Sequence, residues 1–251
     1  MRSWRALVNG AVSLLFEPPC AGCRQRLLRP LDGAVCDDCW SSLRLAPHLH
    51  QRFPPDHAIS WTCAVAHYDG RMKEILHALK YERRRTIAPR LGTLMRERGE
   101  ALLRDADLAV PVPLHPRREY ERGFNQAEDL SNHLGLPVAR LLRRVRYTPS
   151  QIDLPKEERR ANVRDAFEIN ADPRSLISVP CVVVLVDDVS TTGSTLEACA
   201  RVLKAAGVGE VRALTAAKVV QPVAGGPPEV SPHGEVGGRF AGKRAADFRW
   251  T

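Results

Sequence analysis

The segment VVVLVDDVSTTGSTL, residues 182–196, limits what this chain can fold into more than any other stretch of its sequence. The apolar run CVVVLV begins at Cys181 and has no polar alternation, which is typical of a parallel strand covered by helices on both faces. Apolar residues at helical spacing follow from Leu196 to Ala206, and Gly207 is suited to end that helix. This order of strand, loop and helix predicts an α/β fold with an open, mostly parallel sheet.

The loop between this strand and helix combines two acids with six small residues. Ionised carboxylates at Asp187 and Asp188 can accept hydrogen bonds from vicinal hydroxyls such as those of a ribose. Backbone N–H groups of Ser190–Thr195 can surround a phosphate, and the N-terminus of the next helix adds partial positive charge. An ordinary turn with an N-capping Ser or Thr is the alternative, but it does not explain the whole combination. No Walker A motif is present.

A second basic loop follows another predicted strand, in VPVPLHPRREYERGFNQA from Val110 to Ala127. Arginine presents a planar fork of donors, so several arginines at the end of one strand suit a diphosphate. A solvated basic loop is the alternative. The predicted clamp consists of His115, Arg117, Arg118 and Arg122.

Four of the seven cysteines form two C-x-x-C pairs, Cys20/Cys23 and Cys36/Cys39, separated by twelve residues. This spacing is typical of a zinc ribbon, whose closed four-sulfur shell makes the zinc structural. Two disulfides or free thiols are the alternatives, but we expect no signal peptide and hence a reducing, cytoplasmic location. We expect the remaining cysteines in the core and three histidines in loops; these are Cys63, Cys181, Cys199, His48, His50 and His57.

The rest of the chain predicts four regions. We expect an amphipathic helix over residues 1–19, the four-cysteine ribbon over 20–46, an α/β domain over 60–220 and a flexible, Gly- and Pro-rich tail over 221–251. Pro47–Pro55 is predicted to be a linker. Beyond it we expect strands from Trp61, near Leu108, after Gly135, from Cys181 and from Val211, and helices after Gly70, over Ile87–Leu103, over Gln126–Leu134 and over Thr195–Ala206.

The chain is basic, with 37 Lys and Arg against 29 Asp and Glu and a formal charge of +8. Such an excess favours anionic partners, including nucleic acids and diphosphates, without choosing between them. Much of it lies over Arg71–Arg98 and Arg117–Arg164, where a solvated face of mixed charge is the simplest interpretation. We expect no membrane-spanning segment.

Several separate blocks resemble a known family. DDVSTTGST is similar to the signature with which type I phosphoribosyltransferases bind 5-phosphoribosyl 1-diphosphate (PRPP). The four cysteines, HALKY from His77, PVPLHPRREYERGFNQA and QIDLPKEERRANVRDAF from Gln151 precede it in an order that resembles the ComF family of bacteria. The resemblance spans residues 20–218 and implies a zinc ribbon joined to a phosphoribosyltransferase-like domain, with an association with DNA uptake in natural transformation.

This resemblance implies roles for the residues already singled out. Asp187 and Asp188 would bind the ribose hydroxyls, Mg²⁺ would bridge the diphosphate and ribose, and Arg117 and Arg118 would stabilise the leaving diphosphate. A mobile loop over Thr148–Phe167 would close over the site. It contains Lys156, Arg159 and Arg160. The residues that would bind PRPP are Val189, Ser190, Thr191, Thr192, Gly193, Ser194 and Thr195.

Three classes of function stay open at this level. The first is a phosphoribosyltransferase acting on a nitrogenous acceptor, and the second is a PRPP sensor without catalysis. The third is a zinc-ribbon adaptor that binds single-stranded DNA or competence proteins. The sequence names no acceptor and leaves open whether the chain forms homo-oligomers.

Overall fold

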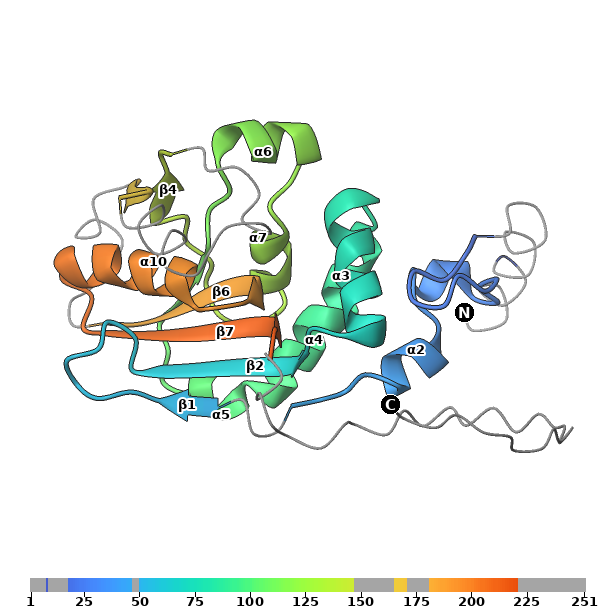
Figure 1. Ribbon diagram of the computed structural model, residues 1–251, viewed down its shortest axis with the longest axis horizontal. Coiled ribbons are helices and arrows are strands. Elements are labelled where there is room, and N and C mark those ends of the chain that lie inside the picture. The colour runs from blue at the N-terminus through green and yellow to red at the C-terminus, as the bar shows by residue number, and fades with distance from the viewer. Residues whose placement is uncertain (1–7, 9–17, 47–49, 147–164, 171–180, 221–251) are drawn as a thin grey trace, which may run out of the picture. The chain divides into compact units, whose positions relative to one another are not determined.

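A five-stranded sheet forms the centre of the fold (Figure 1). The computed structural model describes residue 8 and residues 18–46, 50–146, 165–170 and 181–220. The strands lie in the order β1-β2-β7-β6-β3, and every neighbouring pair is parallel except β1 with β2. This confirms the predicted open, mostly parallel α/β fold. The strands are β1 (His50–Arg52), β2 (Trp61–His67), β3 (Leu108–Pro111), β6 (Val182–Ser190) and β7 (Glu210–Lys218).

Helices pack on both faces of this sheet and divide the buried apolar residues into two clusters. One cluster joins α3, α4 and α7 to the sheet through residues such as Leu76, Leu91 and Leu130. The other lies beneath α10 and includes Cys199 and Leu203. The helices are α2 (Asp37–Ser41), α3 (Gly70–Tyr81), α4 (Ala88–Arg98), α5 (Glu100–Leu103), α6 (Pro116–Arg122), α7 (Gln126–Ser131) and α10 (Ser194–Ala205), with 3-10 turns η1 (Pro30–Asp32) and η2 (Arg85–Ile87). No helix of the described part is long and apolar enough to cross a bilayer.

A small antiparallel pair lies apart from the main sheet. It joins β4 (Leu142–Arg144) to β5 (Phe167–Ile169), and Leu142 and Phe167 pack into the cluster beneath α10. The strand expected after Gly135 is represented by a single bridge between Ala109 and Val138 and then by β4. The main sheet therefore ends at β3 on that side.

The predicted linker over Pro47–Pro55 is wrong for part of its length. Residues 50–52 form the edge strand β1, in which His50 pairs with Cys63 and Arg52 with Trp61. The Arg52 guanidinium also lies 4.1 Å from the centre of the Trp61 ring. Pairing satisfies backbone groups that an open edge of β2 would leave exposed. His50 is therefore a strand residue and not the predicted loop histidine.

The strand that carries the two acids is longer than its apolar run indicates. β6 continues through Asp187 and Asp188 to Ser190, because the nine-residue strand β7 pairs along its whole length and ends with Lys218 beside Ser190. Gly193 then takes a left-handed conformation, with φ of 79°, and α10 starts at Ser194. The acids thus lie within the paired part of β6, near its C-terminal end, and their side chains point to opposite faces of the sheet.

The cysteine-rich segment shares its core with the sheet domain. Cys20, Leu27 and Cys39 are buried in the same cluster as Met72 and Ile75 of α3. The predicted boundary between residues 46 and 60 stays a prediction. The predicted N-terminal helix and tail fall almost entirely outside the described residues, as do His48 and most of the predicted mobile loop.

Candidate functional site

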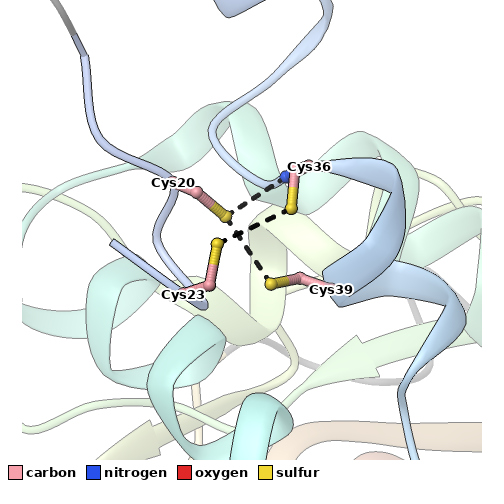
Figure 2. Close-up of side chains that lie close together, drawn as sticks. All are labelled: Cys20, Cys23, Cys36 and Cys39. Carbon is pink, nitrogen blue, oxygen red and sulfur yellow. Dashed lines mark hydrogen bonds between the residues drawn. The ribbon is translucent and has the colours of Figure 1, made fainter. Parts of the chain in front are cut away.

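The four predicted ligand cysteines converge on one point, as Figure 2 shows. Their sulfur atoms lie within 4.8 Å of one another, and the Cys20–Cys39 and Cys23–Cys36 sulfurs are each 3.8 Å apart. Zn–S bonds of about 2.3 Å in a tetrahedron place sulfurs about 3.8 Å apart, whereas disulfide sulfurs are separated by about 2.0 Å. The geometry therefore fits a four-thiolate zinc site, and all four cysteines are free thiols in the structure.

The charges of these sulfurs also suit a bound cation. Burial opposes ionisation of Cys20, but backbone N–H groups outweigh it and lower its pKa to about 6. The N–H groups of Cys36 and Gly22 donate to its sulfur at 3.2 Å and 3.4 Å. By contrast, burial and the neighbouring sulfurs raise the pKa of Cys39. Full deprotonation of the cluster thus requires a metal ion to balance the charge.

Asp188 lies on the face of the sheet that α3 and α7 cover. The Lys80 ammonium, in the last turn of α3, forms an ion pair with its carboxylate, and Gln126 Nε2 donates to Oδ1 at 3.3 Å. The side chains of Lys80 and Asp188 are only 18% and 4% exposed. Sequence reasoning missed Lys80 as a site residue. Its signal was a lysine four residues after Leu76, on the apolar stripe of α3, where burial demands a partner.

The two carboxyls differ in protonation because only one has a lysine. Burial and the negative charge of Asp188 raise the pKa of Asp187 well above its usual range. Burial also opposes ionisation of Asp188, but Lys80 outweighs it, so the pKa of Asp188 is lowered. Asp188 is thus the charged acceptor of the pair. Asp187 Oδ1 accepts the backbone N–H of Asp188 at 2.8 Å.

The predicted phosphate loop adjoins the two acids and opens to one side. Thr192 Oγ1 and Ser194 Oγ lie 2.6 Å apart across the loop, and Thr191 is exposed. Ser190 and Thr192–Ser194 line part of a pocket of about 590 Å³, together with β2, β7 and the start of α10, and neither acid is among its lining residues. Val189 packs against the core instead, so its backbone is what it presents to a ligand.

The predicted diphosphate clamp lies on α6, and its members make different contacts. His115 caps the helix by accepting the Arg117 N–H at Nδ1, and Arg117 pairs with Glu121 at 3.0 Å. Arg122 is half-buried, donates to Gln126 and lies 5.4 Å from the Tyr81 ring centre. Burial lowers the pKa of Arg122 against the opposing effect of the Asp188 and Asp187 charges, so its guanidinium lies in the field of the acids. Arg118 lies near enough to contribute to the same effect.

A further arginine, Arg144 on β4, also reaches this region and was missed by sequence reasoning. Burial and then the charge of Arg118 lower its pKa, whereas Asp187 acts in the opposite direction. Its guanidinium lies 5.4 Å from the Phe167 ring centre. Nothing in LLRRVRY distinguishes it from its neighbours, because the β4–β5 pairing that directs it inward is not local. The predicted loop residues Lys156, Arg159 and Arg160 lie outside the described residues.

Comparison with known proteins places this arrangement in a family. Residues 121–222 match the phosphoribosyl transferase domain family. Competence protein F of Haemophilus influenzae is 28% identical over 204 residues, which cover 77% of this chain and 87% of that protein. DNA utilization protein YhgH of Escherichia coli K12 is 31% identical over 72% of this chain and 82% of that protein. Competence protein ComFC of Bacillus subtilis is 30% identical over 80% of this chain and 82% of that protein. The chain therefore belongs to the ComF family of competence proteins and carries a phosphoribosyltransferase-like domain.

Proposed function

We propose that this protein binds PRPP with Mg²⁺ at the C-terminal end of β6 and transfers the phosphoribosyl group to a nitrogenous acceptor. The observation that carries the proposal is the grouping at one sheet edge of a buried charged carboxylate, Asp188, the loop Ser190–Thr195 and half-buried arginines. Carboxylates suit the ribose diol and the loop suits the 5-phosphate. Arg122, Arg118 and Arg144 provide positive charge for the diphosphate.

In the proposed reaction the bond between the anomeric carbon and the diphosphate breaks, and the diphosphate keeps the electron pair. The acceptor nitrogen forms the new bond and then releases a proton. The arginines would stabilise the charge that develops on the leaving group. Among the described residues the four cysteines form the one cluster of three or more potential metal ligands, so Mg²⁺ would take its ligands mainly from PRPP and water. Bound Mg²⁺ supplies further charge neutralisation of the diphosphate.

Calorimetry with PRPP and Mg²⁺ tests the binding step. We expect saturable binding to the wild type and its loss in Asp187→Asn/Asp188→Asn, which keeps the shape of both side chains. Asp107→Asn is the matched control, because Asp107 accepts the Val182 N–H at 2.8 Å at the opposite end of β6. Absence of binding to a folded, zinc-loaded wild type would refute the proposal. Equal loss in the control would show that the effect is one of folding.

Catalysis is tested separately by diphosphate release across a panel of nucleobases and other nitrogenous acceptors. Release with one acceptor identifies an enzyme, whereas tight PRPP binding without release identifies a sensor. The reduced thiols of the zinc cluster suit the proposed cytoplasmic location.

A second candidate function is binding of single-stranded DNA. Tyr81 and Tyr120 are exposed by 63% and 89% beside the arginines of α6, and exposed aromatics among arginines suit stacking of unpaired bases. The names of the relatives refer to competence and DNA utilization. We expect binding of a labelled single strand to fall steeply with salt and to weaken by about tenfold in Tyr81→Ala/Tyr120→Ala. Unchanged anisotropy titrations of that variant would exclude this surface.

A further inference from the structure

The end of α3 and the turn after it contact four different parts of the molecule with closely spaced charged side chains. Besides the Lys80–Asp188 pair on β6, Arg83 Nη2 donates to the Glu121 carbonyl of α6 at 2.9 Å, and Arg85 donates twice to Asp129 of α7 at 2.7 Å. Glu82 and Arg84 instead contact the cysteine-rich segment. The run KYERRR is therefore a junction, although Arg83 and Arg85 are also exposed, as expected for a solvated face of mixed charge.

Two of these contacts hold the chain on either side of the first metal knuckle, defined here as Cys20–Cys23. Arg24 donates to both oxygens of Glu82, at 2.6 Å and 3.2 Å, and follows Cys23 directly. Arg84 donates to the carbonyl of Pro19, which precedes Cys20, and also pairs with Glu82 at 3.0 Å. Arg24 has a φ of 63°, which is uncommon for a residue other than glycine, so the knuckle must hold it there.

The same helix end positions the charge of the PRPP site. Lys80 lies two residues before Glu82, which is less than one helical turn, so a shift of Glu82 also moves Lys80. The Lys80–Asp188 pair is almost fully buried, and buried ion pairs depend strongly on close geometry. At the other end of α3, Arg71 Nη1 donates to the Gly22 carbonyl inside the knuckle at 3.0 Å.

We propose that Lys80 is a positioning residue of the PRPP site and that the metal-loaded knuckle holds it against Asp188 through Glu82 and Arg84. This inference rests on the proposed binding of PRPP. It makes the zinc cluster part of the machinery that sets PRPP affinity, in addition to its contribution to folding. Zinc would act without touching the ligand, by fixing the end of α3.

The ribbon side of this linkage is tested with Glu82→Gln in calorimetric titrations of PRPP with Mg²⁺. We expect Glu82→Gln to bind PRPP about fivefold more weakly than the wild type, with zinc content unchanged. The matched control is Asp37→Asn, because Asp37 pairs with Arg90 of α4 at 2.7 Å and so also joins the cysteine-rich segment to the sheet domain. The control should bind PRPP as the wild type does.

A double variant tests whether the loss of PRPP affinity arises from the Arg24–Glu82 contact. Arg24→Gln/Glu82→Gln should be no weaker than Glu82→Gln alone, because both remove the same contact. Full affinity in Glu82→Gln, or equal losses in Glu82→Gln and Asp37→Asn, would overturn the inference and leave the proposed function intact. Absence of binding to the wild type would overturn both.

The contribution of Lys80 to PRPP affinity is tested by substitution of Lys80 itself. Lys80→Met should lower PRPP affinity by about tenfold or more, whereas Lys80→Arg, which keeps the positive charge, should restore part of it. Thermal midpoints and zinc content of both variants show whether they fold. If Lys80→Met does not fold, comparison of the PRPP affinities of Lys80→Arg and Glu82→Gln still tests the role of Lys80. Wild-type affinity in a folded Lys80→Met protein would refute the role of Lys80.

Discussion

Asp187 and Asp188 are adjacent in sequence but differ in chemistry. Alternation along β6 turns Asp188 toward Lys80 and Asp187 toward the face that α10 covers, where its charge acts on Cys199 and Arg144. Asp188 is therefore ionised, while Asp187 holds a proton at higher pH than a free carboxyl would. A motif of two acids thus provides one carboxyl with a lowered pKa and one with a raised pKa.

This difference predicts opposite effects of two isosteric substitutions on stability. Between the unfolded pKa of about 3.9 and its raised folded pKa, Asp187 binds more protons in the folded than in the unfolded state, so its contribution becomes less favourable as pH rises. Asp187→Asn should therefore raise the free energy of unfolding by about 1 kcal/mol or more near pH 8, and by less near pH 5. Urea titrations at the two pH values measure this.

Asp188→Asn should instead lower the free energy of unfolding by about 3 kcal/mol, because it leaves Lys80 buried without a counter-charge. The lowered pKa of Asp188 stabilises the fold above its unfolded pKa, and this contribution is lost as pH falls through the folded pKa. If Asp187→Asn proved the more harmful of the two, the assignment of charge within the pair would be wrong.

The candidate site could be predicted from sequence only where its chemistry is local. Asp187, Asp188 and the small residues after them form one continuous motif, and the four cysteines form two short ones. Lys80, Gln126 and Arg144 come from other helices and strands, and only the folded sheet brings them to β6. A lysine on an apolar stripe was detectable, although its partner was not.

At the scale of elements, apolar periodicity predicted the central strands and helices but not where pairing ends. β6 runs four residues past its apolar run because β7 continues beside it, and β1 forms because β2 has a free edge. Both differences arise from neighbours distant in sequence, so no local pattern contains them. The predicted helix after Gly70 and the predicted strand from Trp61 were confirmed.

The first metal knuckle has a steric requirement that can be tested at Gly22. A Cβ atom there would lie 2.8 Å from the Cys39 sulfur and 3.0 Å from the Cys39 Cβ, so the knuckle must shift. We expect Gly22→Ala to lower zinc affinity by about tenfold, measured as zinc retained against a competing chelator. Ser41→Ala, at an exposed position of α2, is the control. Equal zinc retention in the two variants would show that the knuckle accommodates the methyl group.

At the scale of the whole described molecule, the cysteine-rich segment and the sheet domain share a core. Burial of Leu27, Cys39 and Leu43 in the same cluster as Ile75 and Leu79 makes the packing of the sheet domain depend on the metal site. The sequence predicted the ribbon and the sheet domain, with a linker between them. Their common core could not be predicted, because it depends on which face of α3 the ribbon covers.

The strand order has a consequence for folding of the protein during its synthesis on the ribosome. β2 pairs with β7, for example Cys63 with Leu214, so the sheet cannot be completed until the last of its strands has been synthesised. At about 5 to 20 residues per second, β2 waits on the order of ten seconds for its partner. The four cysteines emerge before β2 and can already capture zinc. During this interval the edge of β2 is uncovered in every nascent chain, and chains without zinc would leave the α3 face uncovered as well, when chaperones and proteases have access to both.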